Sequence, residues 1–394
     1  MTRLLPGVGR EQLGPCFLEG IPKEGSVNKT VKTVALMSVI ALGLAGCASK
    51  PSDNSVNAGS ASPSASSSPT VDNSAFKACM VSDSGGFDDK SFNQTSYKGL
   101  TDAKSKLGVS TAQIESHSDS DYVDNVNSMV DQSCNIIVTV GFKLGDATLA
   151  AAQKNPDIDF AIVDSGYAKA PANLKSLSFN TAQSSYLAGY LAAGMTKSGT
   201  VGTFGGLNIP TVAIFMDGYA EGVAAYNAKH GTDVKVVGWD EAKQNGLFTE
   251  DFEDKNKGQA TAQNLVAQGA DILFPVAGPA GLGALQTAKD SGGQVNAIWV
   301  DTDGCVSAAE YCGVLVSSVE KGMDVAVEAA IEDSLNQAFD STPFVGTLEN
   351  GGTDLASFHD FDSKVPDDLK TELDEVKAGI IDGSITIKSQ WQPK

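Results

Sequence analysis

Beyond residue 75 the chain alternates short β-branched runs with stretches of helical length, and this alternation constrains the fold more than any other feature. The run at residues 136–140, Ile-Ile-Val-Thr-Val, is typical of a strand buried on both faces of a parallel sheet. We expect strands at residues 77–81, 113–116, 135–140, 160–163, 201–204, 234–237, 272–276, 297–300 and 314–319. Amphipathic helices are expected at residues 91–107, 144–154, 184–197, 213–229, 256–268, 281–290 and 322–339.

Alternation at this spacing predicts parallel sheets with right-handed crossovers. The folded part spans about 320 residues, which exceeds the usual size of one hydrophobic core. We therefore predict an α/β protein with two Rossmann-like parallel-sheet lobes. The first lobe is expected at residues 75–180 and the second at 181–304, with hinge crossings and shared segments at 305–394.

Three of the predicted strands end in a carboxylate, because Asp83, Asp164 and Asp301 follow them closely. Ligands of open α/β sheets bind beyond the carboxyl ends of the strands. A carboxylate there can accept paired hydrogen bonds from vicinal hydroxyls, such as those of a ribose. Asp also populates ordinary strand-to-helix turns, so these positions alone leave the function open.

The N-terminal region predicts export. Lys29 and Lys32 precede a short apolar run that ends in Leu-Ala-Gly-Cys47. The run is too short to span a membrane. Small residues before Cys47 resemble a lipobox, in which the cysteine is lipidated and becomes the mature N-terminus. The alternative is a secretory signal that merely contains Cys47. We expect residues 1–46 to be the signal peptide, and a translation start at Val27 would give it an ordinary length.

Residues 47–74 are rich in Ser, Pro, Ala and Asn and lack apolar periodicity, which predicts a disordered tether. The net charge of −20 argues against a nucleic-acid partner, which would require clustered Lys and Arg. We expect a monomer on the extracytoplasmic face of the cell membrane, attached through its lipid.

Residues 81–94, Val-Ser-Asp-Ser-Gly-Gly-Phe-Asp-Asp-Lys-Ser-Phe-Asn-Gln, resemble the opening motif of the basic membrane protein family, the purine-nucleoside-receptor-type substrate-binding lipoproteins. Further matches lie at residues 140–142, 161–164, 186–190, 205–206, 218–222, 277–283 and 317–321. The resemblance implies a type I periplasmic-binding-protein fold, in which the two lobes are joined by a hinge and a ligand cleft lies between them. It also implies the binding component of an ABC importer, which holds a nucleoside between its lobes and delivers it to permease and ATPase subunits.

The resemblance assigns the aromatic contact with the base to Phe92 and an adjacent polar contact to Asn93. The opposing ring maps to Phe252, with Phe248 as a rival. Stacking on an aromatic ring contributes about 1–3 kcal/mol per base. Core packing is the alternative role for Phe92.

The remaining contacts implied by the resemblance are acidic, basic or backbone groups. They fall on Asp83 and Asp164 for the base, Gly278 for a backbone contact, and Asp301 with Lys321 for the ribose hydroxyls. Asp303 is the rival of Asp301, and the alternative for Lys321 is a solvated lysine at a helix start.

Four cysteines fit an oxidising location. Cys305 and Cys312 enclose a short loop, and Cys79 and Cys134 could pair across neighbouring strands. The three histidines are scattered along the sequence, so we expect no metal and no cofactor.

The sequence lacks the Gly-rich phosphate loops and the Gly-x-Ser-x-Gly elbow of common enzyme classes, so we expect no enzymatic activity. Asp88 and Asp89 are adjacent and are expected to favour a helix N-terminus. A ligand-sensing or surface-interaction lipoprotein that reuses the fold is the alternative function. A nucleoside hydrolase is a third hypothesis.

Overall fold

The computed structural model describes residues 72–393. The expected signal peptide, Cys47 and the tether up to residue 71 lie outside the described residues. The first strand begins at Asn73, two residues before the expected start of the folded part. Within residues 72–393, no helix is long and apolar enough to cross a membrane.

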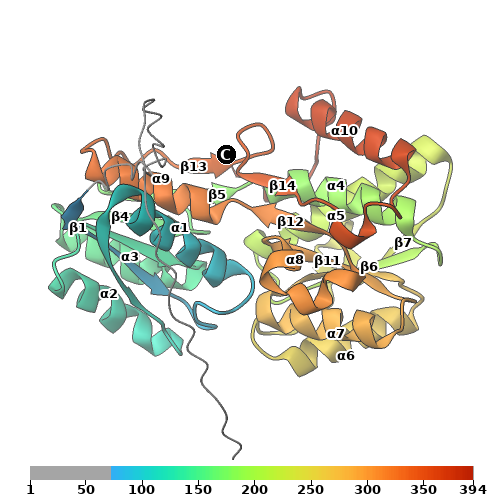
Figure 1. Cartoon of the computed structure of the whole chain (residues 1–394), viewed down its shortest axis with the longest axis horizontal. Coiled ribbons are helices and arrows are strands. Elements are labelled where there is room, and N and C mark those ends of the chain that lie inside the picture. Colours follow the sequence, from blue (N-terminus) through green and yellow to red (C-terminus); the bar gives the residue numbers. More distant parts are fainter. Residues whose placement is uncertain (1–71, 394) are drawn as a thin grey trace, which may run out of the picture. The chain divides into compact units, whose positions relative to one another are not determined.

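Two six-stranded sheets organise the described residues, which confirms the predicted fold class (Figure 1). The first sheet is parallel throughout. Its order is β13 (Phe344–Gly346), β5 (Leu174–Phe179), β4 (Asp159–Val163), β3 (Ile136–Val140), β1 (Asn73–Ser82) and β2 (Val109–Ile114). Helices α1 (Phe92–Leu107) and α9 (Met323–Leu335) pack against each other on one face, and α2 (Tyr122–Asp131) and α3 (Gly145–Lys154) cover the other.

Alternation along the central strand β1 explains this layering. Ala78 and Met80 belong to the core beneath α1 and α9, whereas Cys79 and Val81 belong to the core beneath α2 and α3. All four side chains are fully buried, as expected for a strand whose successive side chains point to opposite, covered faces.

The second sheet is parallel except for its edge strand β14. Its order is β14 (Thr353–Leu355), β12 (Leu315–Lys321), β11 (Asn296–Asp301), β10 (Ile272–Val276), β6 (Thr200–Gly205) and β7 (Lys235–Val237). One core includes residues of α4 (Thr181–Met195), α5 (Pro210–His230) and α10 (Asp367–Ile381). The other includes residues of α6 (Lys255–Ala267), α7 (Leu282–Asp290) and the region of α8 (Gly304–Ser307). A small hairpin pairs β8 (Trp239–Asp240) with β9 (Asn245–Gly246).

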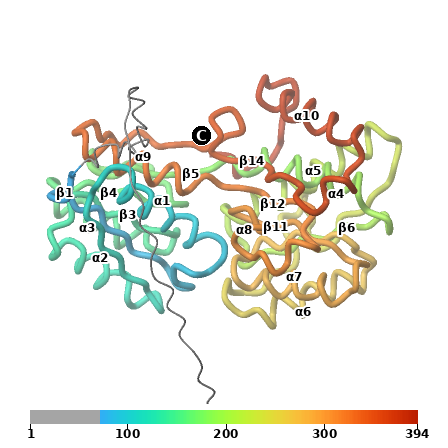
Figure 2. Tube along the Cα trace, viewed as in Figure 1, coloured from blue at the N-terminus to red at the C-terminus, as the bar shows by residue number. Residues whose placement is uncertain are grey.

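The chain passes between the two sheets at residues 179–181, 321–323 and 346–353, as the trace in Figure 2 lets the reader follow. Residues 305–321, expected in the shared C-terminal part, lead into β12 of the second sheet. Further on, α9 and β13 pack with the first sheet, and β14 and α10 pack with the second.

Some expected boundaries are wrong. Strand β2 runs from Val109 to Ile114 rather than over residues 113–116. Strand β5 is absent from the prediction because its sequence contains Lys175, which is nevertheless buried. The ammonium group of Lys175 lies 3.0 Å from the carboxylate of Asp333, so an ion pair compensates its burial.

Helix α4 and residues 212–219 of α5 are buried on nearly all sides rather than amphipathic, and the two helices pack tightly against each other. A Cβ atom at Gly222 of α5 would lie 2.0 Å from the carbonyl oxygen of Tyr186 on α4. The motifs at residues 186–190 and 218–222 therefore serve this helix contact.

Both cysteine pairs suggested by the sequence form disulfides in the structure. Cys79 of β1 is bonded to Cys134, just before the neighbouring β3, with 6.0 Å between the Cα atoms. Cys305 is bonded to Cys312 across 4.6 Å between the Cα atoms.

Candidate functional site

A cavity of about 180 Å³ is lined by residues from both sheet units. All eight residues predicted to contact the ligand line it, namely Asp83, Phe92, Asn93, Asp164, Phe252, Gly278, Asp301 and Lys321. Asp83 and Asp164 follow strands β1 and β4 of the first sheet, and Phe92 and Asn93 begin α1, which packs on that sheet. Asp301 and Lys321 end strands β11 and β12 of the second sheet, and Phe252 and Gly278 lie on connecting segments beside it. The rivals Phe248 and Asp303 are not among the lining residues.

The first turn of α1 is held by Asp89. Its carboxylate accepts hydrogen bonds from the backbone N–H groups of Ser91 at 3.0 Å, Asn93 at 2.8 Å and Gln94 at 3.0 Å. This confirms the helix-start role expected for Asp89, and burial raises its pKa to about 6. Asp88 is exposed and forms an ion pair with Lys90 instead. This turn fixes the positions of Phe92 and Asn93, the two predicted ligand contacts at the start of α1.

Asp83 and Asn93 form a polar pair in the cavity wall. The Nδ2 atom of Asn93 donates a hydrogen bond to Oδ1 of Asp83 at 2.9 Å. Burial raises the pKa of Asp83 to about 7, and the hydrogen bond from Asn93 offsets only part of this effect. Among the described residues, the buried Oδ1 atom of Asn93 has no hydrogen-bond partner. The pair therefore offers a ligand both an unused acceptor and a carboxyl group that changes protonation near neutral pH.

Lys321 and Asp164 form an ion pair in which both side chains are nearly buried, with 3% and 10% exposed. The ammonium group of Lys321 also lies 4.9 Å from the ring centroid of Phe92. Cations close to a ring face are attracted to it. The ammonium group of Lys321 therefore lies between the Asp164 carboxylate and the Phe92 ring, both of which are predicted ligand contacts.

Asp301, at the end of β11, contacts the first sheet unit directly. Its Oδ2 atom accepts a hydrogen bond from the hydroxyl of Ser91 at 2.6 Å, and the nearby Trp299 indole donates to the carbonyl of Lys90 at 3.1 Å. Burial raises the pKa of Asp301, whereas the charge of Lys321 lowers it. The two sheet units are therefore in contact at the cavity.

The backbones of Asp164 and Asp301 share an unusual conformation. Both have positive φ angles, 63° and 70°, in the left-handed region that is uncommon for residues other than glycine. Such strain persists where surrounding structure imposes it and concentrates at functional sites. Here it occurs at corresponding strand ends of the two sheets.

Phe252 lies on the loop before α6, and a glycine makes room for it. A Cβ atom at Gly206 would lie 2.3 Å from the Phe252 ring. The carbonyl of Phe252 accepts a hydrogen bond from the N–H of Ala280 at 2.8 Å, which anchors the loop. Phe248 instead packs edge-on against Trp239, with 6.1 Å between the ring centroids.

The charge balance of the cavity is acidic. Its described lining includes the carboxylates of Asp83, Asp89, Asp164, Glu250, Asp251, Glu253 and Asp301, against the ammonium groups of Lys143 and Lys321. A neutral ligand rich in hydrogen-bond donors suits such a lining, whereas a phosphate would be repelled.

Several lining residues were not predicted from the sequence, among them Phe142 and Phe215. Phe215 lies near the start of α5, and the Lys321 ammonium group is 5.8 Å from its ring centroid. In the sequence Phe215 falls within the apolar run at residues 212–216, which by itself indicates only a buried helix. Phe142 follows β3 and lies in the motif at residues 140–142 that resembles the basic membrane protein family, which was the signal for it.

A family model described as "ABC transporter substrate-binding protein PnrA-like" matches residues 76–345. The ABC transporter nucleoside-binding protein BmpA of Lactococcus lactis subsp. cremoris is 31% identical over 80% of this chain and 90% of that protein. The CD4+ T-cell-stimulating antigen of Listeria monocytogenes is 30% identical over 79% of this chain and 88% of that protein. Basic membrane protein A of Borreliella burgdorferi is 29% identical over 77% and 86%.

Solved structures support the fold. An ABC transporter solute-binding protein from Aeropyrum pernix aligns with a TM-score of 0.70 and 24% identity, covering 80% of this chain and 93% of that one. A transcriptional activator of the comK gene from Bacillus halodurans aligns with a TM-score of 0.64 and 18% identity, covering 79% and 100%. At these identities the likeness concerns the fold alone.

Proposed function

The chain belongs to the family of PnrA-like ABC transporter substrate-binding proteins, and from this premise we propose that it binds a purine nucleoside in the cavity and delivers it to an ABC permease. The observation that carries the proposal is the cavity itself, which combines aromatic rings, an amide and three strand-end carboxylates. The name of the Lactococcus lactis relative, a nucleoside-binding protein, supports the same ligand class.

The base would bind between Phe92 and Phe252, because a purine is a flat π-surface and each stacked ring contributes about 1–3 kcal/mol. Asn93 and Asp83 would contact its polar edge. The unpartnered Oδ1 atom of Asn93 can accept from a ring or exocyclic N–H, and a protonated Asp83 can donate to a ring nitrogen. Asp164 would add a further acceptor.

The ribose would bind at Asp301 and Lys321. A carboxylate accepts both vicinal hydroxyls, and an ammonium group donates to their oxygens. A site that hydrogen-bonds a hydroxyl rejects analogues that lack it, because its own buried groups are left unpaired. We therefore expect discrimination against free bases and against 2′,3′-dideoxynucleosides.

The acidic lining favours nucleosides over nucleotides. Seven carboxylates and two lysines line the described cavity, so the phosphate of a nucleotide would enter a field of the same sign. A nucleoside carries no charge at neutral pH and avoids this repulsion.

Attachment would be through lipidated Cys47, so that the tether holds the folded part close to its permease on the extracytoplasmic face. Single acyl chains bind membranes marginally, and stable anchoring needs more than one. On this proposal the protein acts as a monomer without a cofactor and catalyses no reaction.

Uptake of a radiolabelled purine nucleoside by cells that lack this chain tests the proposal. Wild-type protein should restore uptake, whereas Asp301→Asn and Cys47→Ser should each restore it poorly. Lys235→Met, which removes an exposed lysine of β7, serves as the control and should restore uptake fully. Unchanged uptake in cells lacking the chain would contradict the importer function and favour a sensing role.

A further inference from the structure

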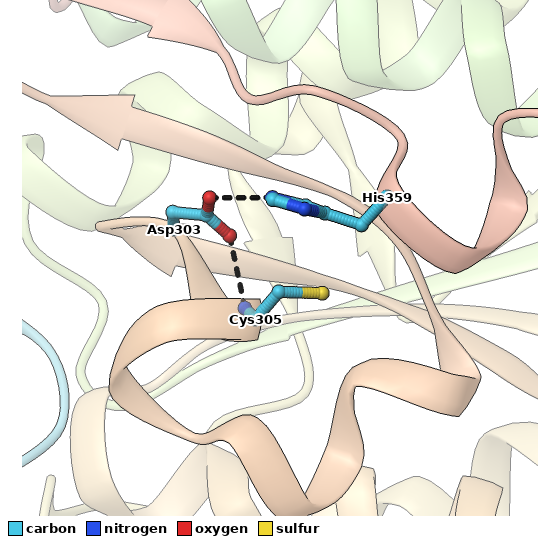
Figure 3. Close-up of side chains that lie close together, drawn as sticks. All are labelled: Asp303, Cys305 and His359. Carbon is cyan, nitrogen blue, oxygen red and sulfur yellow. Dashed lines mark hydrogen bonds and ion pairs between the residues drawn. The ribbon is translucent and has the colours of Figure 1, made fainter.

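A second cluster of chemically active side chains lies outside the cavity, beside α8. One ligand atom each of Asp303, Cys305 and His359 lies within 4.8 Å of the others (Figure 3). Cys312 joins the cluster through its disulfide with Cys305. Two of the four residues precede or begin α8, Cys312 follows it in the 3₁₀ turn Ala309–Val314, and His359 comes from the 3₁₀ turn His359–Phe361.

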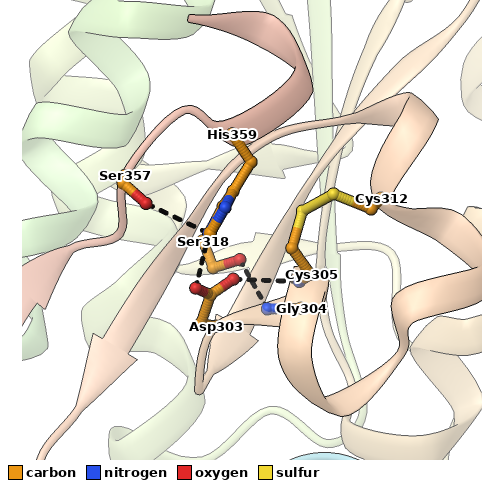
Figure 4. Close-up of a disulfide and its surroundings, with 7 residues drawn as sticks. All are labelled: Asp303, Gly304, Cys305, Cys312, Ser318, Ser357 and His359. Carbon is orange, nitrogen blue, oxygen red and sulfur yellow. Dashed lines mark hydrogen bonds and ion pairs between the residues drawn. A yellow bond between two sulfur atoms is a disulfide. The ribbon is translucent and has the colours of Figure 1, made fainter.

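The histidine is held toward the carboxylate. Its Nε2 atom lies 2.6 Å from Oδ2 of Asp303 and 3.0 Å from the hydroxyl of Ser357. The other carboxylate oxygen of Asp303 accepts from the backbone N–H of Cys305 at 2.9 Å. Figure 4 shows the His359 ring and the Asp303 carboxylate beside the Cys305–Cys312 disulfide.

We propose that the Cys305–Cys312 disulfide masks a zinc site, and that its reduction allows Asp303, Cys305, Cys312 and His359 to bind one Zn²⁺ ion. Zinc is bound tetrahedrally by cysteine sulfur, histidine nitrogen and aspartate oxygen. The four side chains supply two sulfurs, one nitrogen and one oxygen, which completes that coordination number. The proposal is independent of nucleoside binding.

The unmasking step is a two-electron reduction, in which two thiols of the reductant are oxidised to a disulfide, or a phosphine is oxidised with water to its phosphine oxide. The S–S bond breaks, two electrons and two protons are taken up, and two thiols form. Binding of Zn²⁺ then releases both thiol protons to solvent as the thiolates coordinate the metal. The Nε2 atom of His359 must be unprotonated to bind, so its hydrogen resides on Nδ1 in the bound form.

Charge and accessibility both favour this site. Two thiolates and one carboxylate carry three negative charges, which more than balance the two positive charges of the metal. Cys305 and Cys312 are only half-buried and His359 has 34% of its side chain exposed, so reductant and metal can reach them. Cys79 and Cys134 are buried, with 0% and 3% exposed, so their disulfide is shielded from the same reductant.

In the oxidised protein the two sulfurs are bonded to each other and provide no thiolate. Asp303 and His359 then pair with each other through a hydrogen bond. On zinc binding the imidazole hydrogen would be carried on Nδ1, and the metal would lie between Nε2 of His359 and the carboxylate of Asp303. Reduction therefore converts the disulfide and the histidine–carboxylate pair into four separate side chains that can each bind the metal.

The test titrates zinc into the full chain, carrying Cys16→Ser and Cys47→Ser so that other thiols do not bind the metal, against a chromophoric chelator. Before reduction no stoichiometric zinc binding should occur. After treatment with a phosphine and removal of the excess, one equivalent should bind, and a thiol assay should count two freed thiols. Cobalt added in place of zinc should give the visible absorption of a tetrahedral thiolate complex.

Single variants test whether the proposed side chains themselves bind zinc or whether removal of any histidine or carboxylate has the same effect. His359→Ala and Asp303→Asn should each weaken zinc binding by about tenfold or more in the reduced protein. His230→Ala removes the other histidine that contacts a carboxylate, at 2.8 Å from Glu372, and should change nothing. Equal zinc binding before and after reduction would overturn the proposal, as would unchanged affinity in the reduced His359→Ala variant.

Discussion

Lys321, the last residue of β12, forms an ion pair with Asp164, which follows β4, so a single charge pair joins the second sheet to the first at their carboxyl ends. Both side chains are nearly buried. Removing charges from water is costly, and the pair compensates for that cost only while both partners are present. The same pair lines the cavity, so a bound ligand would contact charges that the protein already holds in place.

Loss of one partner should destabilise the fold. We expect Lys321→Met to lower the free energy of unfolding by about 3 kcal/mol, because Asp164 is left buried without its counter-charge. The double variant with Asp164→Asn should lose less than the sum of the two single variants. Urea unfolding measures all three. Lys235→Met, from a pair with both side chains well exposed, should change stability by no more than about 0.5 kcal/mol. Additive losses would contradict a coupled pair.

The hydrogen bond from Ser91 to Asp301 connects the two sheet units and should stabilise the arrangement in which they are in contact. We expect Ser91→Ala to increase the population in which the units have separated, since hydrogen bonds to charged groups contribute about 1.5–3 kcal/mol. Small-angle X-ray scattering of the protein without ligand should show a larger radius of gyration. Ser105→Ala removes a hydroxyl that bonds only within α1 and should leave the scattering unchanged. Identical scattering from all three proteins would count against this role.

The close approach of Gly206 to Phe252 predicts a variant that affects binding more than folding. A methyl group in Gly206→Ala would overlap the Phe252 ring, which can rotate away but then no longer lines the cavity in the same position. Nucleoside affinity should fall about tenfold or more, as expected from losing a stacked ring. Gly313→Ala places its methyl group in open space and serves as the control. Calorimetry of both variants measures the difference, and equal affinities would show that Phe252 does not contact the base.

The raised pKa of Asp83 predicts the pH dependence of stability. Its pKa is about 7 in the folded protein, against 3.8 as an ordinary value, so the folded state binds more protons between these pH values. The free energy of unfolding should therefore fall as pH rises from about 4 to about 7, by at most about 1.4 kcal/mol per pH unit from this group. Asp89 and Asp301 act in the same direction.

Asp83→Asn isolates the contribution of this one carboxyl. The variant should gain stability relative to the wild type as pH rises, because its side chain carries no charge to bury. Urea unfolding at about pH 5 and about pH 8 gives the two differences. If the free energies of unfolding of the wild type and the variant differ by the same amount at both pH values, the raised pKa of Asp83 is contradicted.

Much of the fold was predictable because its central strands are continuous apolar runs. Strand β3 is buried at every position, and a continuous apolar run of this length predicts such a fully buried strand. Strand β5 escaped prediction because Lys175 is compensated by Asp333, a residue far away in the sequence that no local pattern reveals. Helices α4 and α5 were predicted as helices, but their amphipathic character was wrong for α4 and for the first half of α5, where residues are buried on all sides and no polar face exists.

The residues that line the cavity were predictable because strand ends converge at one edge of a parallel sheet and because the opening motif resembles a known family. The contacts that these residues make with one another and with other side chains could not be predicted. The resemblance assigned Asp301 and Lys321 to the ribose hydroxyls but gave no contacts among the protein's own side chains, and the structure places an ion pair between Lys321 and Asp164 and a hydrogen bond between Ser91 and Asp301. These contacts join separate sheet units, so they depend on how the units meet rather than on spacing along the chain. The same applies to His359, whose contact with Asp303 links turns from distant parts of the sequence.

Isothermal titration calorimetry of the full chain with adenosine, guanosine and inosine tests the central claim most directly. We predict that at least one of them binds one-to-one with micromolar or tighter affinity, and that the corresponding free base, ribose and nucleoside 5′-monophosphate bind far more weakly. Absence of heat or thermal stabilisation with every common nucleoside, in a protein that unfolds cooperatively, would contradict the assignment of this cavity to a nucleoside.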